Sequence, residues 1–188
     1  MHELSYNLLY KGYLTIGFSE FTSPEMIAKV RNGDSDYLNA KFRELWGEGA
    51  HRRKNALKNF LSMGTGDTVV VLLWGNFCLC KIIGEQPLVI ADAYSKGLAY
   101  WHGKAVGKGD NWLYREDGSS CDLGFGHKVE MISVEISKAK FADAALSKRI
   151  KSDKRTPTST IWHRTLEIVL VAIRTAMPML LPFLSSSN

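Results

Sequence analysis

Cysteine is scarce in this chain, with three residues among 188. An odd and low number of cysteines argues against a framework of disulfides and is typical of a reducing compartment. Cys78 and Cys80 alternate along one apolar run, so their side chains should point the same way and pack as small buried hydrophobes. We therefore expect a cytoplasmic protein in which the cysteines serve packing.

Sequence signatures of catalysis are also missing. The chain contains no phosphate-binding loop, no GxSxG, no HExxH and no paired CxxC motif. The histidines are scattered, and none forms a pair with ligand-like spacing. The carboxylates and lysine that would suit a metal nuclease are also typical of a solvent-facing strand: Glu130, Glu135 and Lys138. The sequence thus makes no positive case for an enzyme, a cofactor or a bound metal.

Segments for export or membrane crossing are weakly represented. The start, MHELSYNLLYKGY, lacks a basic stretch followed by an apolar core, so no signal peptide is expected. Residues 168–184 are strongly apolar but fall short of the ~20 residues of a membrane span, and Arg174 interrupts them. We expect a helix over about 159–177 that packs on the domain or on a second copy of the chain through residues 160–184. Membrane contact is the alternative.

The overall composition is that of a globular protein. Apolar residues make up 45% and charged residues 23% of the chain, enough to form a core. The net charge of +5 permits a polyanionic partner without requiring one. Length and composition indicate one domain over residues 1–158, followed by an apolar C-terminal helix in residues 159–188.

The central stretch is GDTVVVLLWGNFCLCKIIG at 66–84, two apolar runs joined by a Gly-Asn turn signal. This pattern predicts a β-hairpin with both faces covered. A strand is expected at 13–18, with close approach or a bulge at Gly12 and Gly17. Another is expected at 127–136, with a bulge near 132–133. These strands suggest an α+β fold built on a small bent β-barrel.

Helices are expected around this barrel. Ser23 as N-cap and Pro24 at the first turn begin a helix that ends at Asn32-Gly33. Apolar residues at helical spacing predict further helices at 37–46, 53–63 and 141–150. Residues 85–126 are interpreted as a long glycine-rich and aromatic excursion, in which 88–93 could be a strand.

Two basic runs are candidates for phosphate contact. One begins a helix with His51-Arg52-Arg53-Lys54, where cations oppose the helix dipole and a phosphate partner would relieve the penalty. The other spans residues 138–155. Such contacts would supply affinity without sequence information, although either run could be a solvated face. The candidate phosphate-binding residues are Arg52, Arg53, Lys54, Lys148, Arg149, Lys151, Lys154 and Arg155.

Aromatic residues form 11% of the chain, more than a small core normally uses. Core packing is one explanation for them. The other is a surface for stacking an unpaired or flipped base. The residues in this excess are Tyr13, Phe18, Trp46, Trp74, Trp101 and Trp112. Tyr13 and Phe18, with Trp46 or Trp74, are the candidates for the stacking pocket.

The order of motifs resembles the PUA-like superfamily, and within it EVE-like modules of modification-dependent restriction and other phage-defence proteins. The resemblance rests on GYLTIGF at 12–18, FLSMGTGDTVVV at 60–71, GNFCLCKIIGE at 75–85 and HKVEMISVEI at 127–136, and it covers about residues 10–155. It implies a small bent β-barrel flanked by helices that recognises DNA or RNA, in several relatives through a modified base flipped into an aromatic pocket.

The resemblance also implies a position for the pocket. Phe18 stands where relatives often have a pocket-side Trp, and Tyr13 falls on the same strand. Trp74 and Phe77 flank the hairpin turn. The chain departs from the pattern in having Phe rather than Trp at 18 and in the long excursion at 85–126.

The leading hypothesis is a non-catalytic module that binds nucleic acid, DNA rather than RNA, in a prokaryotic or phage defence context. Any chemistry would come from a partner subunit. The rival hypothesis is an interaction or effector protein that oligomerises or contacts a membrane through its C-terminal segment, while its barrel senses a protein or a small nucleotide.

Overall fold

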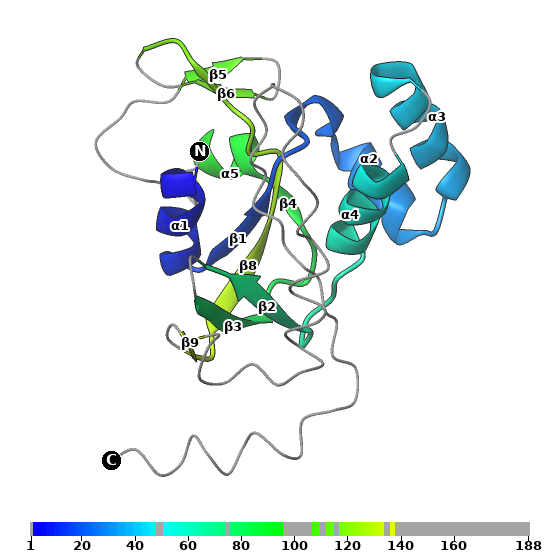
Figure 1. The fold of residues 1–188 in the computed structure, drawn as a ribbon. Helices are drawn as coiled ribbons and strands as arrows, with labels where there is room; N and C mark the ends of the chain where they lie inside the picture. Colours follow the sequence, from blue (N-terminus) through cyan, green and yellow to red (C-terminus); the bar gives the residue numbers. More distant parts are fainter. Residues whose placement is uncertain are drawn as a thin grey trace, which may run out of the picture.

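The computed structural model describes residues 2–47, 51–73, 76–95, 107–109, 112–114, 117–133 and 136–137. Its centre is a curled antiparallel sheet of six strands in the order β1-β8-β3-β2, with β4 also paired to β8 and β9 to β3 (Figure 1). The strands of this sheet are β1 (Tyr13–Ile16), β2 (Thr68–Leu72), β3 (Asn76–Ile82), β4 (Leu88–Val89), β8 (Phe125–Met131) and β9 (Ile136–Ser137). Helices pack around the sheet, so the fold class is α+β.

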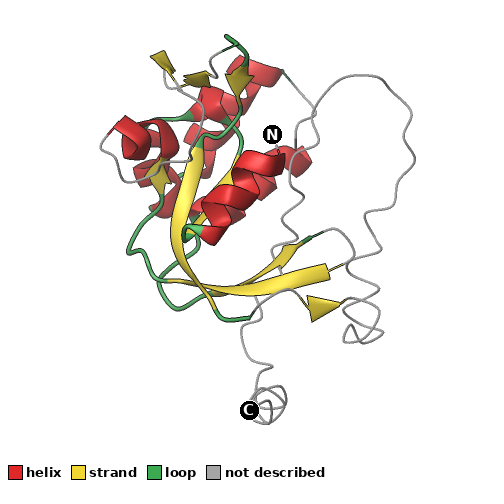
Figure 2. Ribbon diagram, turned by 90° about the vertical axis from the view of Figure 1, so that its left-hand side faces the viewer, coloured by secondary structure: helices red, strands yellow, loops and turns green. Residues whose placement is uncertain are grey.

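Strand β8 produces the curl of the sheet. Its first residues pair with β1, in a register that places Ile16 opposite Phe125. Its last residues pair with β3, where Ile82 lies opposite Val129. Because one strand serves different neighbours along its length, the sheet bends through a half-barrel, as Figure 2 shows. The expected α+β fold with a bent sheet is therefore present.

The predicted hairpin is confirmed in the described residues. Strands β2 and β3 pair from Thr68 opposite Lys81 to Leu72 opposite Phe77. The side chains alternate between the main core and a second, smaller apolar cluster, so both faces of the hairpin are buried. Cys78, Cys80 and Cys121 are buried and are not joined in disulfides, as small packing residues would be.

A bulge ends strand β8 where the sequence predicts one. The backbone N–H groups of Ile132 and Ser133 both donate to the carbonyl of Leu79, at 2.8 and 3.3 Å. Two residues opposite one is the signature of a β-bulge. Pairing to β3 then resumes in β9, with Ile136 opposite Phe77.

Three helices follow strand β1 much as the sequence predicts. They are α2 (Pro24–Arg31), α3 (Ser35–Trp46) and α4 (His51–Leu61). The hydroxyl of Ser23 accepts a bond from the Met26 N–H at 2.9 Å, which confirms this residue as the N-cap of α2. In Figure 1 this helical group and α1 (His2–Tyr10) lie on opposite sides of the β1–β8 part of the sheet.

Helix α1 is absent from the sequence-based expectations. It buries Leu4 and Leu8, one helical turn apart, against β1. The strand expected over residues 88–93 is wrong beyond its first two residues. The chain leaves β4 after Val89 and continues as α5 (Ile90–Ser95).

The glycine-rich excursion contains structure of its own. Within it, three short strands form a separate antiparallel sheet in the order β5-β6-β7. These strands are β5 (Gly107–Gly109), β6 (Trp112–Tyr114) and β7 (Ser120–Cys121). Leu113 and Cys121 are fully buried in the main core, so this small sheet packs as part of the domain.

Several expectations fall outside the described residues. These are the helices at 141–150 and 159–177, the basic run at 138–155 and the apolar run at 168–184. No helix in the part of the chain that the structure describes is long and apolar enough to cross a membrane.

Candidate nucleic-acid interface

The turn after β1 has an unusual backbone. Phe18 adopts the left-handed conformation, with φ 67° and ψ 38°, which a bulky residue rarely adopts. The N–H of Ser19 donates to Oδ1 of Asp122 at 2.9 Å. A Cβ atom on Gly17 would press on the same carboxylate, so a larger residue there would push Asp122 away from the Ser19 N–H. The turn is thus fixed against residues 122–124, and it sets the direction of the Phe18 side chain.

That side chain enters a cluster of four aromatic rings. Phe18 stacks on Trp46 with ring centroids 5.5 Å apart, and Phe21 stacks on Phe42 at 4.3 Å. The two pairs meet edge to face, with Phe42 and Phe21 at 5.2 and 5.0 Å from Trp46. The three phenylalanines are buried, whereas Trp46 at the end of α3 is half-buried. Trp46 is therefore the ring of this cluster that reaches the surface.

A cation from the next helix lies over that tryptophan. The guanidinium carbon of Arg53 is 5.2 Å from the Trp46 ring centroid, within the range of a cation–π contact. Arg53 is itself exposed, so the contact lies at the surface. A planar cation and an indole thus meet where α3 ends and α4 begins.

The two lysines of α4 also contact neutral groups. Lys54 donates from Nζ to Oδ1 of Asn39, and Lys58 donates to the hydroxyl of Ser35 at 3.3 Å. Helix α4 has no acidic residue in its first turn, and its sequence HRRKNALKNFL contains none at all. Neither of the two ion pairs found among the described residues involves this helix. We call Arg53, Lys54, Lys58 and Trp46 the α3–α4 corner.

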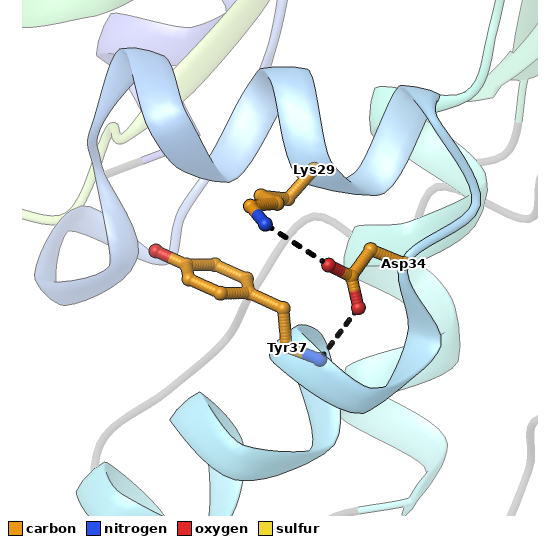
Figure 3. Close-up of polar contacts among 3 residues, drawn as sticks. All are labelled: Lys29, Asp34 and Tyr37. Carbon is orange, nitrogen blue, oxygen red and sulfur yellow. Dashed lines mark hydrogen bonds and ion pairs between the residues drawn. The ribbon is translucent and has the colours of Figure 1, made fainter.

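The α2–α3 corner differs in charge pairing (Figure 3). Nζ of Lys29 lies 3.2 Å from Oδ2 of Asp34 and 5.7 Å from the Tyr37 ring centroid. Oδ1 of Asp34 accepts the Tyr37 N–H at 2.9 Å and so caps α3. These contacts, first the Tyr37 N–H and then Lys29, lower the pKa of Asp34 below its ordinary value. Here the carboxylate is held in its charged form by groups of the chain itself.

The structure brings together only some of the predicted site residues. Phe18, Trp46 and Arg53 adjoin one another, and Lys54 follows on the same helix. Tyr13 is half-buried at the other end of β1 and packs on the main core. Phe77 lies in the second apolar cluster, so it is not part of this group of rings. Trp74, the Arg52 side chain and the cations from Lys148 to Arg155 are outside the description.

Sequence reasoning missed two rings and one cation of this region. Phe42 was expected only as an apolar helix position, and Phe21 lies in a short 3-10 turn (Ser19–Phe21) with no periodic pattern. Lys58 lies one turn beyond Lys54 on α4, and this spacing could have revealed it.

In the part of the chain that the structure describes, carboxylates and metal ligands form no comparable group. Glu130 is exposed on β8 opposite Lys81, which is the solvent-face explanation of its alternation. The other two residues considered for a nuclease, Glu135 and Lys138, are outside the described ranges. Within those ranges, no three His, Cys, Asp or Glu residues lie close enough to hold a metal ion.

Comparison with known proteins adds no identity to this geometry. No protein-family model matches the chain, and none of the curated proteins or solved structures is significantly similar to it.

Proposed function

We propose that this chain is a non-catalytic nucleic-acid-binding module, with the α3–α4 corner as its contact surface. The observation that carries the proposal is the pairing of the α4 cations. Arg53, Lys54 and Lys58 contact an indole ring, an amide and a hydroxyl, and none of these groups neutralises their charge. A row of cations without carboxylates is suited to phosphates, which release counterions when they bind.

Trp46 adds a stacking surface to these cations. Single-stranded binding commonly combines a cationic row with an aromatic ring that stacks on a base. Since Phe18 is buried beneath it, Trp46 is the ring that a base would meet. Arg53 covers Trp46 in the free protein, so a base stacking on that ring face would displace the guanidinium towards the phosphates.

A buried hydroxyl next to Phe18 agrees with recognition of an extruded base. Oγ of Ser19 has no hydrogen-bond partner among the described residues, although the residue is only 1% exposed. An unpaired buried polar atom costs about 1–3 kcal/mol. A base edge could satisfy this group if the turn opened. The PUA-like or EVE-like assignment and a preference for modified DNA belong to this same proposal.

The test measures binding to labelled single-stranded and duplex DNA over a salt series. We compare Arg53→Gln/Lys54→Gln with a charge-matched control, Lys29→Gln/Lys41→Gln, in which the lysines come from α2 and α3 and pair with Asp34 and Glu44. In the α4 variant the slope of log K against log salt should become shallower by about 1.8 on duplex and about 1.4 on single strands. The control should keep the wild-type slope.

If the salt slope became equally shallow in both variants, binding would respond to net charge alone, and this result would refute a localised surface. Absence of binding by the wild type at about 50 mM salt would refute the proposal itself, since phosphate contacts are strongest there. RNA and base-modified DNA of the same length test the finer preference. Trp46→Ala tests the stacking role, because it should weaken single-strand binding more than duplex binding.

A further inference from the structure

The carboxylate of Asp122 is fixed on one side and accessible on the other. Its Oδ1 accepts the backbone N–H of Ser19 at 2.9 Å, which holds it beside the turn after β1. Its Oδ2 lies over Gly17, at the place that a side chain there would occupy. No described residue donates a hydrogen bond to Oδ2, and Asp122 is only half-buried. This carboxylate therefore keeps the capacity to accept hydrogen bonds from a ligand.

A buried hydroxyl lies next to this carboxylate. Ser19 is 1% exposed, and its Oγ has no hydrogen-bond partner within the described ranges. Covalent geometry keeps Oγ close to the backbone N–H of the same residue, which is the group that Asp122 binds. Buried hydroxyls in folded proteins nearly always have a partner, so one without any points to a missing ligand group.

The turn that holds these groups is continuous with the α3–α4 corner. Phe18 precedes Ser19 and stacks on Trp46 with ring centroids 5.5 Å apart. Its left-handed backbone, with φ 67°, is maintained by the bond from the next residue to Asp122. Residues held in such sparsely populated conformations are concentrated at binding and catalytic sites. The carboxylate thus lies in the region that we propose for nucleic-acid contact.

The two groups differ in the hydrogen bonds that they can make. A carboxylate only accepts, whereas a serine hydroxyl can donate or accept. Among the standard bases, guanine alone presents two adjacent donors on its Watson–Crick edge, N1–H and the N2 amino group. A carboxylate can accept both at once, as it does from an arginine fork. The O6 atom beside N1 is an acceptor that a serine hydroxyl can satisfy. Adenine, cytosine and thymine instead bring an acceptor against the negative charge.

We propose that Asp122, together with Ser19, recognises the Watson–Crick edge of guanine. This inference rests on the proposed function and deepens it by naming the base. An unpaired or extruded guanine of a nucleic acid and a free guanine nucleotide present the same edge, so both are sources of the ligand. The carboxylate is accessible in the free protein, whereas contact with the Ser19 hydroxyl requires the turn to open.

The test compares two carboxylates that bind the backbone in the same way. Asp122→Asn and Asp34→Asn each remove one negative charge and keep an oxygen for the N–H that the aspartate accepts, from Ser19 or Tyr37, both at 2.9 Å. Asp34 is the control, because its other oxygen is already paired with Lys29 (Figure 3). Affinity is measured for labelled oligothymidylate with and without one central guanine. Free guanosine and adenosine monophosphates are titrated by NMR.

The wild type should bind the guanine strand at least about fivefold more tightly than the thymine strand. Inosine, which lacks the N2 amino group, should give a smaller preference. Asp122→Asn should lose the preference, because its amide presents a donor to the guanine donors, and Asp34→Asn should keep it. Ser19→Ala should reduce the preference without lowering the melting temperature, since its hydroxyl has no described partner to lose.

Equal wild-type affinity for the two strands, with no response to guanosine monophosphate, would overturn the guanine inference. Salt-dependent binding at the α3–α4 corner would survive that result, so the two failures are distinguishable. A preference that persists in Asp122→Asn would also overturn it. If that variant fails to fold, an unchanged preference in Ser19→Ala would do the same. A response to the free guanine nucleotide alone would support the inference and identify that nucleotide as the source.

Discussion

Two helix junctions of the same domain use lysine and arginine in different ways. At the α2–α3 corner, Lys29 pairs with Asp34, and the carboxylate also caps the next helix. At the α3–α4 corner, Arg53 lies on Trp46, and Lys54 donates to an amide. The first corner satisfies its own charges. The second leaves positive charge on a helix that contains no acidic residue.

The difference shows how a structural contact can be separated from a binding surface. Exposed ion pairs contribute little to stability, but they lower the local field that a polyanion would sense. Cations held by neutral groups keep that field and remain free to exchange their partner for a phosphate. The arrangement of partners, more than the number of cations, therefore marks α4 as the candidate interface.

The largest expected effect comes from removing the aromatic floor of the α3–α4 corner. Phe42 is 3% exposed and stacks on Phe21, so Phe42→Ala should lower the free energy of unfolding by about 3–5 kcal/mol. Chemical denaturation followed by circular dichroism measures this loss. A cost near zero would mean that the rings can repack, and the fixed position of Trp46 would then no longer follow from the cluster.

The second expected effect is a pH dependence of stability, and it comes from His127, which contacts Phe60 of α4. The ring of His127 is fully buried, and its Nε2 is 2.9 Å from the Phe60 carbonyl, so this nitrogen carries the proton. Nδ1 has no partner among the described residues. Burial lowers the pKa of His127 below 6.5, against the smaller opposing effect of that carbonyl, while nearby Arg31 lowers it and Asp67 raises it.

The direction in which stability changes with pH follows from proton uptake by the unfolded chain. Below about pH 6.5 the unfolded chain binds a proton that buried His127 does not, so stability should fall as pH decreases and level off below the folded-state pKa. The slope from this group is at most about 1.4 kcal/mol per pH unit. His127→Gln should flatten this part of the stability profile. An NMR titration in which His127 becomes charged at or above pH 6.5 would contradict the assignment.

The sequence predicts the helix boundaries and the central hairpin of this fold. Ser23 before Pro24 and the glycines that follow α2 and α3 mark boundaries through single-residue chemistry, and the β2–β3 hairpin follows from its alternating runs and turn signal. Helix α1 is not expected from the sequence because it is short and its apolar face consists of only three buried leucines, Leu4, Leu8 and Leu9. After Val89 the chain continues as helix α5, because an apolar run this short does not by its periodicity distinguish a strand from a helix.

The sequence predicts only part of the candidate site. Phe18 and Trp46 were selected as aromatics, but nothing in the sequence indicates that Phe77 faces a separate cluster. Likewise, Lys29 and Lys54 are both lysines on helices. Their partners, a carboxylate and an amide, are set by how the helices cross. The partner of each lysine is therefore known only from distances in the folded chain and cannot be derived from composition.

The smallest effect tests the comparison most directly, because it separates stability from binding. Asp34→Ala removes the α3 cap and the partner of Lys29, so the melting temperature should fall by about 2–4 °C, while DNA affinity stays level or rises as a negative charge is lost. Arg53→Ala removes an exposed contact whose partner is a ring, so the melting temperature should shift by less than about 1 °C, whereas DNA affinity should fall.

For each of the two variants, calorimetry measures the change in melting temperature and the salt-dependent binding assay measures the change in DNA affinity. If Arg53→Ala lowers melting as much as Asp34→Ala and leaves binding intact, the α3–α4 corner is a structural contact like its neighbour. In that case the contacts of the α4 cations with neutral groups would need another explanation.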